Sequence, residues 1–152
     1  MIKTIAIIPA RGGSKRIKNK NIKLFNNKPM IFWSISAALK SKLFDQIIVS
    51  TDNYKIAKIA KDCGAIVPFI RDKKLADDFT SVQAVVKDTL RQLSNNLIIP
   101  KYVCCIYACA PYISIKDLKA SFNKLKKIND SFIFPVTEYA HPIQRAFLVN
   151  DN

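Results

Sequence analysis

Residues 5–22 read IAIIPARGGSKRIKNKNI, an apolar run that leads directly into a basic loop. The apolar run Ile5 to Ile8 predicts a buried strand, which we expect to span Thr4 to Ile8. Strands that are continuously apolar are typical of parallel sheets covered on both faces. Between Arg11 and Lys28 there are seven Lys or Arg residues and no Asp or Glu. Positive charge therefore collects where a buried strand ends.

The loop after this strand has the composition of an anion site. Gly12, Gly13 and Ser14 can turn backbone N–H groups around an anion, because glycine has no Cβ to block the approach. Arg11 and Lys15 flank the loop and can reach phosphate oxygens. The spacing matches neither a Walker A loop, G-x-x-x-x-G-K-[ST], nor the dinucleotide fingerprint G-x-G-x-x-G. The sequence thus predicts phosphate binding by a loop that matches neither of these two motifs.

Strand and helix patterns alternate along the rest of the chain. Strands are predicted at 46–51 and 102–108, with a proline-interrupted edge segment at 65–69 and a last strand at 131–136. Helices are predicted at 29–44, opened by Pro29; at 53–63, capped by Asp52 and stopped by Gly64; at 81–93, capped by Thr80 or Ser81; and at 115–128, capped by Ser114.

This alternation predicts an α/β fold: a doubly wound, Rossmann-like and mostly parallel sheet in a single domain, residues 1–152. Ligands of such sheets bind beyond the carboxyl ends of the strands. Polar residues stand at those ends: Arg11 to Lys15, Thr51–Asp52, Arg71, Tyr107 to Pro111 and Thr137–Glu138.

Charge and cysteine usage narrow the function classes. A net charge of +14 attracts nucleic acid, anionic membranes or phosphorylated small molecules, although much of the lysine can be solvated surface. Cys63, Cys104, Cys105 and Cys109 form no C-x-x-C pair and the chain has one histidine, so reduced thiols are favoured over zinc ligands. No apolar run is long enough to span a bilayer and no export signal is evident, which predicts a cytoplasmic protein without membrane contact.

Several separated motifs resemble one family. IAIIPARGGSKRIKNKNI, IIVSTD, VPFIR, LADD and YVCCIYACAP occur in the order found in cytidylyltransferases that activate nine-carbon, sialic-type sugar acids. The resemblance covers essentially the whole chain. It implies a nucleotidyltransferase fold of the GT-A-like type, and a reaction of CTP with the sugar acid that gives a CMP-sugar and diphosphate. VTEYAHPIQRA is most similar to the branch that acts on pseudaminate, with N-acetylneuraminate and legionaminate as alternatives.

The resemblance also implies roles for particular residues. Arg11 and Lys20 would hold the triphosphate and carry the catalytic role, with Lys15 and the backbone of Gly12, Gly13 and Ser14 lining it. Asn21 and Arg71 would read the cytosine and its ribose. The sugar acid would lie near Tyr107, Gln144 and Arg145, where Arg145 suits a carboxylate.

Two departures from the family pattern stand out. Ala108–Cys109 replaces the usual Pro-Thr, which removes a hydroxyl. Family members also continue through further strands, a subunit-pairing segment and the aspartates that bind Mg²⁺. We therefore expect a chain that is incomplete at its C-terminus, relatives that are homodimers, and Mg²⁺ ligands outside these residues. Asp77 and Asp78 are predicted to form a turn before a helix and not a metal pair.

Two other function classes stay open. One is an inactive remnant that folds and still binds nucleotide. The other is a basic nucleic-acid-binding module, against which the sequence shows neither a stacked aromatic platform nor helix-turn-helix spacing. His141, which precedes Pro142, is predicted to be a turn residue and not an acid or base.

Overall fold

The computed structural model describes residues 3–128 and 132–138. The chain divides into two compact units, Met1–Lys119 and Ala120–Asn152, so the single domain expected over residues 1–152 stays a prediction. The first unit contains the parallel sheet and all residues of the pocket considered below. Gln144, Arg145 and His141 lie outside the described residues.

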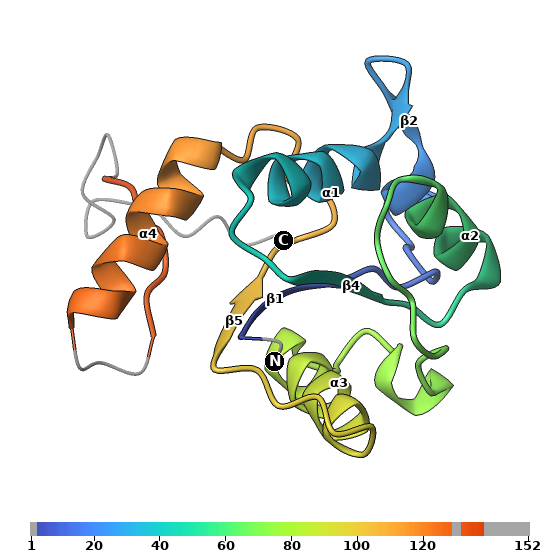
Figure 1. The fold of residues 1–152 in the computed structure, drawn as a ribbon. Helices are drawn as coiled ribbons and strands as arrows, with labels where there is room; N and C mark the ends of the chain where they lie inside the picture. Colours follow the sequence, from blue (N-terminus) through green and yellow to red (C-terminus); the bar gives the residue numbers. More distant parts are fainter. Residues whose placement is uncertain (1–2, 129–131, 139–152) are drawn as a thin grey trace, which may run out of the picture. The chain divides into compact units, whose positions relative to one another are not determined.

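A parallel sheet forms the centre of the first unit, as predicted, and within the described residues it has three strands (Figure 1). The central strand is β1, Thr4–Pro9, flanked by β4, Gln46–Ser50, and by β5, Tyr102–Cys105. The β1–β4 ladder runs from Ile5 opposite Gln46 to Pro9 opposite Ser50. On the other side, Thr4 lies opposite Tyr102 and Ile7 opposite Cys105. All three strands therefore end at the same edge of the sheet.

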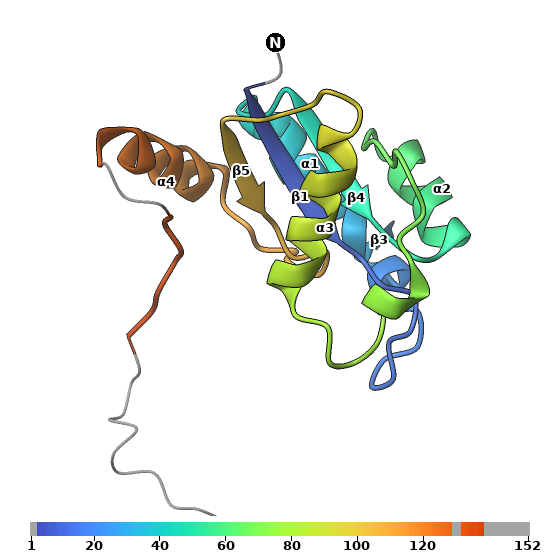
Figure 2. The same cartoon turned by 90° about the horizontal axis from the view of Figure 1, so that it is seen from below.

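Helices cover both faces of the sheet (Figures 1 and 2). On one face, α1 (Met30–Ser41) and α2 (Tyr54–Asp62) pack on Ala6 and Ile8. On the other face, α3 (Val82–Ser94) buries Leu93 against Ile5, Ile7 and Ile48. The alternating side chains of β1 thus feed two separate apolar clusters. The 3–4 spacing of Ile31, Ile35, Ala38 and Leu39 predicts one buried face for α1; the first three are buried, but Leu39 is 46% exposed.

Helix caps follow the sequence closely, with one correction. Ser81 caps α3 by accepting the N–H of Ala84 at 3.2 Å. The cap of α2 is Asn53 and not Asp52, because the Asn53 side chain accepts two backbone N–H groups of the first turn, at 2.9 and 3.1 Å. Gly64 follows α2 with φ 94°, a left-handed conformation that glycine adopts without strain. Asp52 is therefore free for another contact.

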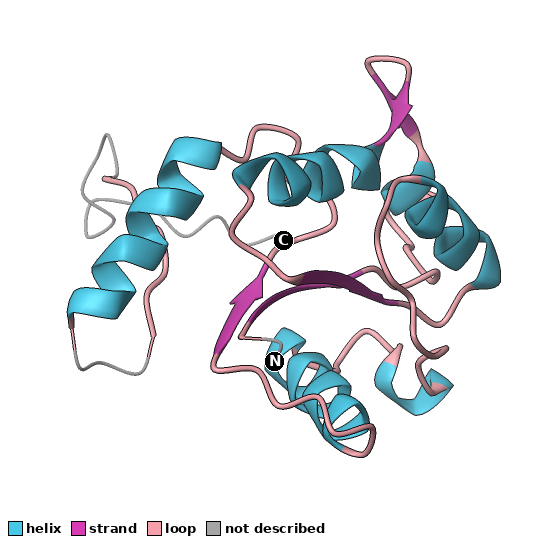
Figure 3. Ribbon diagram, viewed as in Figure 1, coloured by secondary structure: helices cyan, strands magenta, loops and turns pink. Residues whose placement is uncertain are grey.

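Smaller elements complete the described chain (Figure 3). A short hairpin that was not predicted pairs β2 (Leu24–Phe25) with β3 (Lys28–Pro29), and its turn places Asn26 and Asn27 at positive φ. The Trp33 indole N–H anchors it by donating to the Phe25 carbonyl at 3.1 Å. Two 3₁₀ turns, η1 (Lys20–Ile22) and η2 (Lys73–Leu75), and helix α4 (Ile115–Lys127) complete the list.

Two strand predictions need correction. The strand predicted at 102–108 is shorter than expected, because β5 ends at Cys105. Within the described residues β5 pairs with β1 alone, and Val103 is 37% exposed. The segment 131–136 is not a strand within its described part, because residues 132–138 make no ladder with another described strand. The proline-interrupted segment at 65–69 does run along the sheet edge: Ile66 bridges Ile48 of β4, and Ile70, just after the segment, bridges Thr51, just after β4.

The order of the strands fixes where a ligand can enter. The chain leaves β1 for β4 on one side and later returns to β5 on the other, so the connections diverge between the ends of β1 and β5. Ligands of doubly wound sheets bind at this switch point. Within the described residues, no helix is both long and apolar enough to cross a membrane.

We predict that Gly12→Ala destabilises the protein whereas Gly13→Ala does not. A Cβ at position 12 would lie 2.9 Å from Nδ2 and 3.0 Å from Cβ of Asn53, the α2 cap, whereas a Cβ at position 13 meets nothing within 4 Å. Overpacking of this kind costs about 1–3 kcal/mol, and an uncrowded surface substitution stays within about 0.5 kcal/mol. Urea unfolding of both variants measures this difference, and equal stabilities would contradict the close approach.

Candidate functional site

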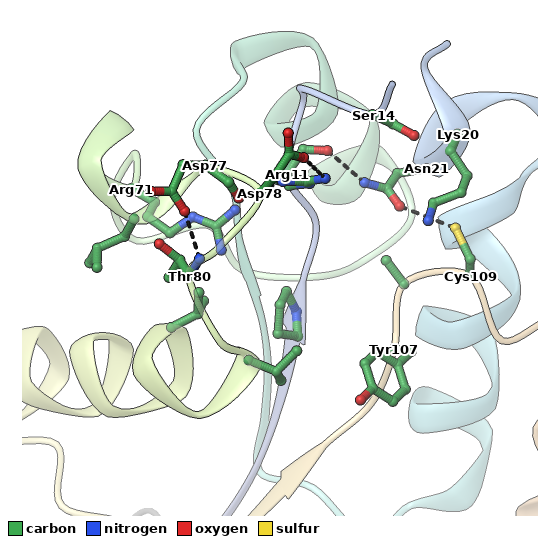
Figure 4. Close-up of a pocket in the computed structure, with 15 residues that line it drawn as sticks. Arg11, Ser14, Lys20, Asn21, Arg71, Asp77, Asp78, Thr80, Tyr107 and Cys109 are labelled. Carbon is green, nitrogen blue, oxygen red and sulfur yellow. Dashed lines mark hydrogen bonds and ion pairs between the residues drawn. The ribbon is translucent and has the colours of Figure 1, made fainter. Parts of the chain in front are cut away.

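A pocket of about 250 Å³ lies at the switch point, beyond the carboxyl ends of β1 and β5 (Figure 4). It is bounded by the loop after β1, the segment after β5, and the chain that leads into α3. The lining residues are Pro9, Arg11, Ser14, Lys20, Asn21, Arg71, Leu75, Asp77, Asp78, Thr80, Val82, Val85, Tyr107, Ala108 and Cys109. The pocket thus combines three cationic side chains with an apolar wall from the start of α3.

The basic loop is held by a carboxylate from a distant segment. Arg11 donates from Nη2 to Oδ1 of Asp78 at 2.5 Å and from Nη1 to the backbone carbonyl of Asp77. Lys15 reaches the other oxygen of Asp78 at 2.5 Å. These contacts hold the pKa of Asp78 below its ordinary value, with the Lys15 contact as the larger cause and the Arg11 contact next. One carboxylate therefore bridges two cations of the predicted phosphate loop.

A second carboxylate lies beneath the glycine loop. Asp52 accepts the backbone N–H of Gly12 at 2.8 Å, and the same oxygen lies 3.8 Å from Nη2 of Arg71. The absence of a Cβ at Gly12 lets the loop lie against Asn53 at the start of α2. Asp52 therefore links the loop after β1 to Arg71, which follows the edge segment. The Gly12 N–H group is bonded to this carboxylate and not available to an anion in this conformation.

Arg71 is the most unusual side chain of the pocket. It is 3% exposed, and its Nε has no hydrogen-bond partner among the described residues. Its backbone N–H donates to the Thr51 carbonyl at 2.8 Å, which fixes the residue beside the end of β4. Burial lowers the pKa of the guanidinium, while the nearby Asp52 opposes that shift. A buried guanidinium with an unpaired N–H donor is costly, because that donor has lost its hydrogen bonds to water.

Asn21 is held from two sides. It lies in η1, is 6% exposed, and donates from Nδ2 to the Arg11 carbonyl at 2.8 Å. The Cys109 thiol donates to its Oδ1 at 3.2 Å. The backbone just before Cys109 is fixed in turn by the buried Ser34 hydroxyl of α1, which donates to the Tyr107 carbonyl at 2.8 Å. The two loops that bound the pocket are thereby joined through one amide.

The predicted site residues separate into three groups. Those that line the pocket are Arg11, Ser14, Lys20, Asn21, Arg71 and Tyr107. Gly12, Gly13 and Lys15 do not line it, although Lys15 contacts Asp78 at its rim. Gln144 and Arg145 fall outside the described residues.

Sequence reasoning missed the part played by Asp78. Its neighbour Asp77 forms the expected turn before α3, by accepting the N–H groups of Phe79 and Thr80. The one available signal was indirect: a loop with seven cations and no acid needs a counter-charge from elsewhere in the chain. That signal could not say which of the 11 acidic residues supplies it.

The carboxylates near the pocket do not form a metal site. Asp78 is engaged by Arg11 and Lys15, Asp52 by Gly12 and Arg71, and Asp77 by backbone N–H groups. A hard divalent cation needs several oxygen ligands that are free to converge on it. Within the described part of the chain, no group of three His, Cys, Asp or Glu residues is arranged to hold a metal. These residues therefore do not fit Mg²⁺.

Comparison with known proteins identifies the family. The family model described as cytidylyltransferase matches residues 5–149. The chain belongs to the cytidylyltransferase family. The pocket lies beyond the ends of parallel strands, which is where doubly wound sheets bind their ligands.

The pseudaminic acid cytidylyltransferase of Campylobacter jejuni is 45% identical in sequence to this chain, over 99% of the chain's length. This chain spans 65% of the length of that relative. A CMP-N,N'-diacetyllegionaminic acid synthase of Legionella pneumophila is also 45% identical, over 59% of this chain and 38% of that protein.

The solved structures agree on the fold. A CMP:2-keto-3-deoxy-manno-octonic acid synthetase in complex with CTP superposes with a TM-score of 0.70 at 19% identity. The match covers 82% of this chain and 48% of that one. This similarity confirms the predicted nucleotidyltransferase type of α/β fold.

We predict that Asp78→Asn removes part of the pH dependence of stability. Because the pKa of Asp78 is lowered in the folded protein, its contribution is complete above about pH 4, the ordinary carboxyl range. The contribution disappears as the pH falls through the lowered folded value. The difference in Tm between the wild-type protein and D78N should therefore shrink as a series of buffers approaches about pH 3.

Other carboxyl groups also make the stability depend on pH, and they remain in the D78N variant. The pKa values of Asp45 and Asp77 are also lowered, through backbone N–H groups and through the Thr80 side chain respectively. D78N should accordingly keep some acid sensitivity. Tm profiles that run parallel down to the lowest pH would show that the Asp78 bridge contributes nothing to folding.

Proposed function

We propose that this protein is a cytidylyltransferase that transfers the cytidylyl group of CTP to pseudaminate, giving CMP-pseudaminate and diphosphate. The observation that carries this proposal is the match to pseudaminic acid cytidylyltransferase along 99% of the chain. The match to the legionaminic acid synthase extends over 59%. A substrate-specific pattern should persist along the whole chain, which favours pseudaminate over legionaminate.

The phosphate side of the pocket is proposed to be formed by Arg11, Lys20 and Ser14. Arg11 presents a planar guanidinium at the end of β1, and Lys20 stands across the pocket in η1. Asp78 already supplies an anionic oxygen 2.5 Å from Arg11 and another 2.5 Å from Lys15. A carboxylate oxygen resembles a phosphate oxygen in charge and in its demand for donors. A triphosphate would therefore take over contacts that Asp78 now makes.

The base and ribose are proposed to lie against Asn21 and Arg71. Asn21 can still offer one N–H and one lone pair, since two of its four hydrogen-bonding positions are in use. Arg71 offers its unpartnered Nε–H from a buried position. An amide with one donor and one acceptor suits the amino and carbonyl groups of cytosine. The apolar residues Val82 and Val85 form the adjoining wall of the pocket.

The sugar acid is proposed to approach from the side of Tyr107, whose side chain is 66% exposed at the pocket rim. Gln144 and Arg145 keep their predicted roles toward the substrate and its carboxylate. In the reaction, the anomeric hydroxyl attacks the α-phosphorus and releases its proton to solvent, while the bond from that phosphorus to the oxygen of the β-phosphate breaks and diphosphate leaves. Arg11 and Lys20 would hold the triphosphate in line and offset the negative charge that grows on the leaving group. Mg²⁺ stays a prediction from family resemblance, because the described carboxylates do not fit it.

We predict that CTP binds and that Arg11→Ala weakens binding more than Lys18→Ala. Lys18 is the matched control, because it is an exposed cation of the same loop that does not line the pocket. A charge-assisted hydrogen bond to phosphate contributes about 1.5–3 kcal/mol, whereas a distant surface charge contributes little. Calorimetric titration with CTP measures both losses.

Equal losses in the two variants would overturn the assignment of Arg11 to the triphosphate. A single-stranded RNA included as a competitor separates the nucleic-acid alternative. If RNA binds more tightly than CTP and displaces it, the protein is a basic nucleic-acid-binding module.

We also predict that the pocket prefers cytosine. CTP should raise the Tm more than ATP or GTP at the same concentration, because a purine cannot satisfy both Asn21 and Arg71 in the same way. Asn21→Ala should reduce the difference between the nucleotides while leaving a general stabilisation by triphosphate. Equal shifts with all three nucleotides would refute base recognition but leave triphosphate binding intact.

A further inference from the structure

Cys109 contacts the side chain that is proposed to read the base. Its Sγ lies 3.2 Å from Oδ1 of Asn21, although 88 positions separate the two residues in the chain. Both residues line the pocket, and Figure 4 shows the thiol directed at the amide. Asn21 uses its Nδ2 on the carbonyl of Arg11 at 2.8 Å. The contact is therefore part of the pocket wall itself.

The two contacts together define the orientation of the Asn21 amide. The amide nitrogen faces a carbonyl, which can only accept, and the amide oxygen faces a thiol, which donates. Turning the amide over would set two oxygens against each other at Arg11. The side chain of Asn21 is buried, so water cannot replace a lost partner at low cost. Burial also raises the pKa of the Cys109 thiol against the opposing charge of Lys20, which keeps the donor proton in place.

The backbone that carries Cys109 is itself firmly placed. The buried hydroxyl of Ser34 lies 2.8 Å from the Tyr107 carbonyl and 3.3 Å from the Ala108 carbonyl. Helix α1 thus fixes the segment after β5, and that segment brings the thiol to Asn21. Because the position of Cys109 is fixed by its own backbone, its S–H group can determine the orientation of the Asn21 amide.

We propose that Cys109 is a specificity-determining positioning residue: its S–H group holds Asn21 in the one orientation that reads cytosine. The free lone pair of Asn21 Oδ1 then accepts from the amino group of cytosine, and uracil presents an oxygen at that position. Cys109 acts through Asn21 and leaves phosphate binding to Arg11 and Lys20. This inference rests on the proposed function of the pocket.

The test compares two nearly isosteric variants of the 152-residue protein, Cys109→Thr and Cys109→Val. Threonine keeps a donor and valine has none. Titrations with CTP, UTP and inorganic pyrophosphate give three affinities for each variant. Cys109→Val should weaken CTP binding about two- to tenfold, the range of one neutral hydrogen bond, and lower the ratio of CTP to UTP affinity. Cys109→Thr should keep that ratio, and pyrophosphate affinity should be the same in both.

A double-mutant cycle distinguishes positioning from general packing. In an Asn21→Ala background, Cys109→Val and Cys109→Thr should bind CTP equally, because there is no amide left to orient. Thermal unfolding without ligand identifies a variant that fails to fold. In that case the smaller pair Cys109→Ser and Cys109→Ala, which also differ in a donor, provides the same comparison.

Each result decides between the two proposals. Equal CTP-to-UTP ratios in the two variants, or an unchanged difference between them in the Asn21→Ala background, would overturn the role of Cys109 alone. A parallel loss of pyrophosphate affinity would overturn it as well, by showing a disturbance of the whole pocket. A wild-type protein without preference for CTP over UTP would overturn both the role of Cys109 and the proposed recognition of the base.

Discussion

The burial of β1 on both faces and along both sides is the constraint on which the rest of the molecule depends. Ile5, Ile7 and Ile8 are fully buried, and hydrogen-bonded ladders to β4 and β5 leave β1 no free edge. Every segment that follows a strand must therefore leave at one edge of the sheet. The basic loop, Arg71 and Cys109 are remote in sequence, and they meet because this edge is common to all of them.

The electrostatic arrangement of the pocket follows from that convergence. A chain with 25 basic and 11 acidic residues has few acids to place, yet two of them stand beside the basic loop. Asp52 binds a backbone N–H group under the loop, and Asp78 binds two side chains over it. The first contact shapes the loop and the second neutralises it. Most of the remaining lysines are exposed and contribute to net charge without shaping the site.

Much of this arrangement could be predicted from sequence because it depends on local periodicity. The run at Ile5–Ile8, the cap at Ser81 and the stop at Gly64 each specify structure within a few residues. The contacts of Asp78 and Cys109 could not be predicted in this way, since they join segments 67 and 88 positions from their partners. The cap of α2 was misassigned to Asp52 because Asn53 offers the same chemistry one residue later. A final strand was expected at 131–136, but its described residues, 132–136, pair with no other described strand.

The carboxylate of Asp78 has a consequence for the kinds of anion that can bind to Arg11 and Lys15. A tethered anion competes at a high effective concentration with any anion from solution. A small monoanion such as chloride or acetate gains little by displacing it, since one weak partner is exchanged for another. A polyanion that also reaches Lys20 and Arg71 makes contacts that Asp78 does not make. These additional contacts offset the free energy lost when the contacts of Asp78 are broken. On the proposed function, the cations of the pocket would therefore bind extended phosphate chains in preference to simple monoanions.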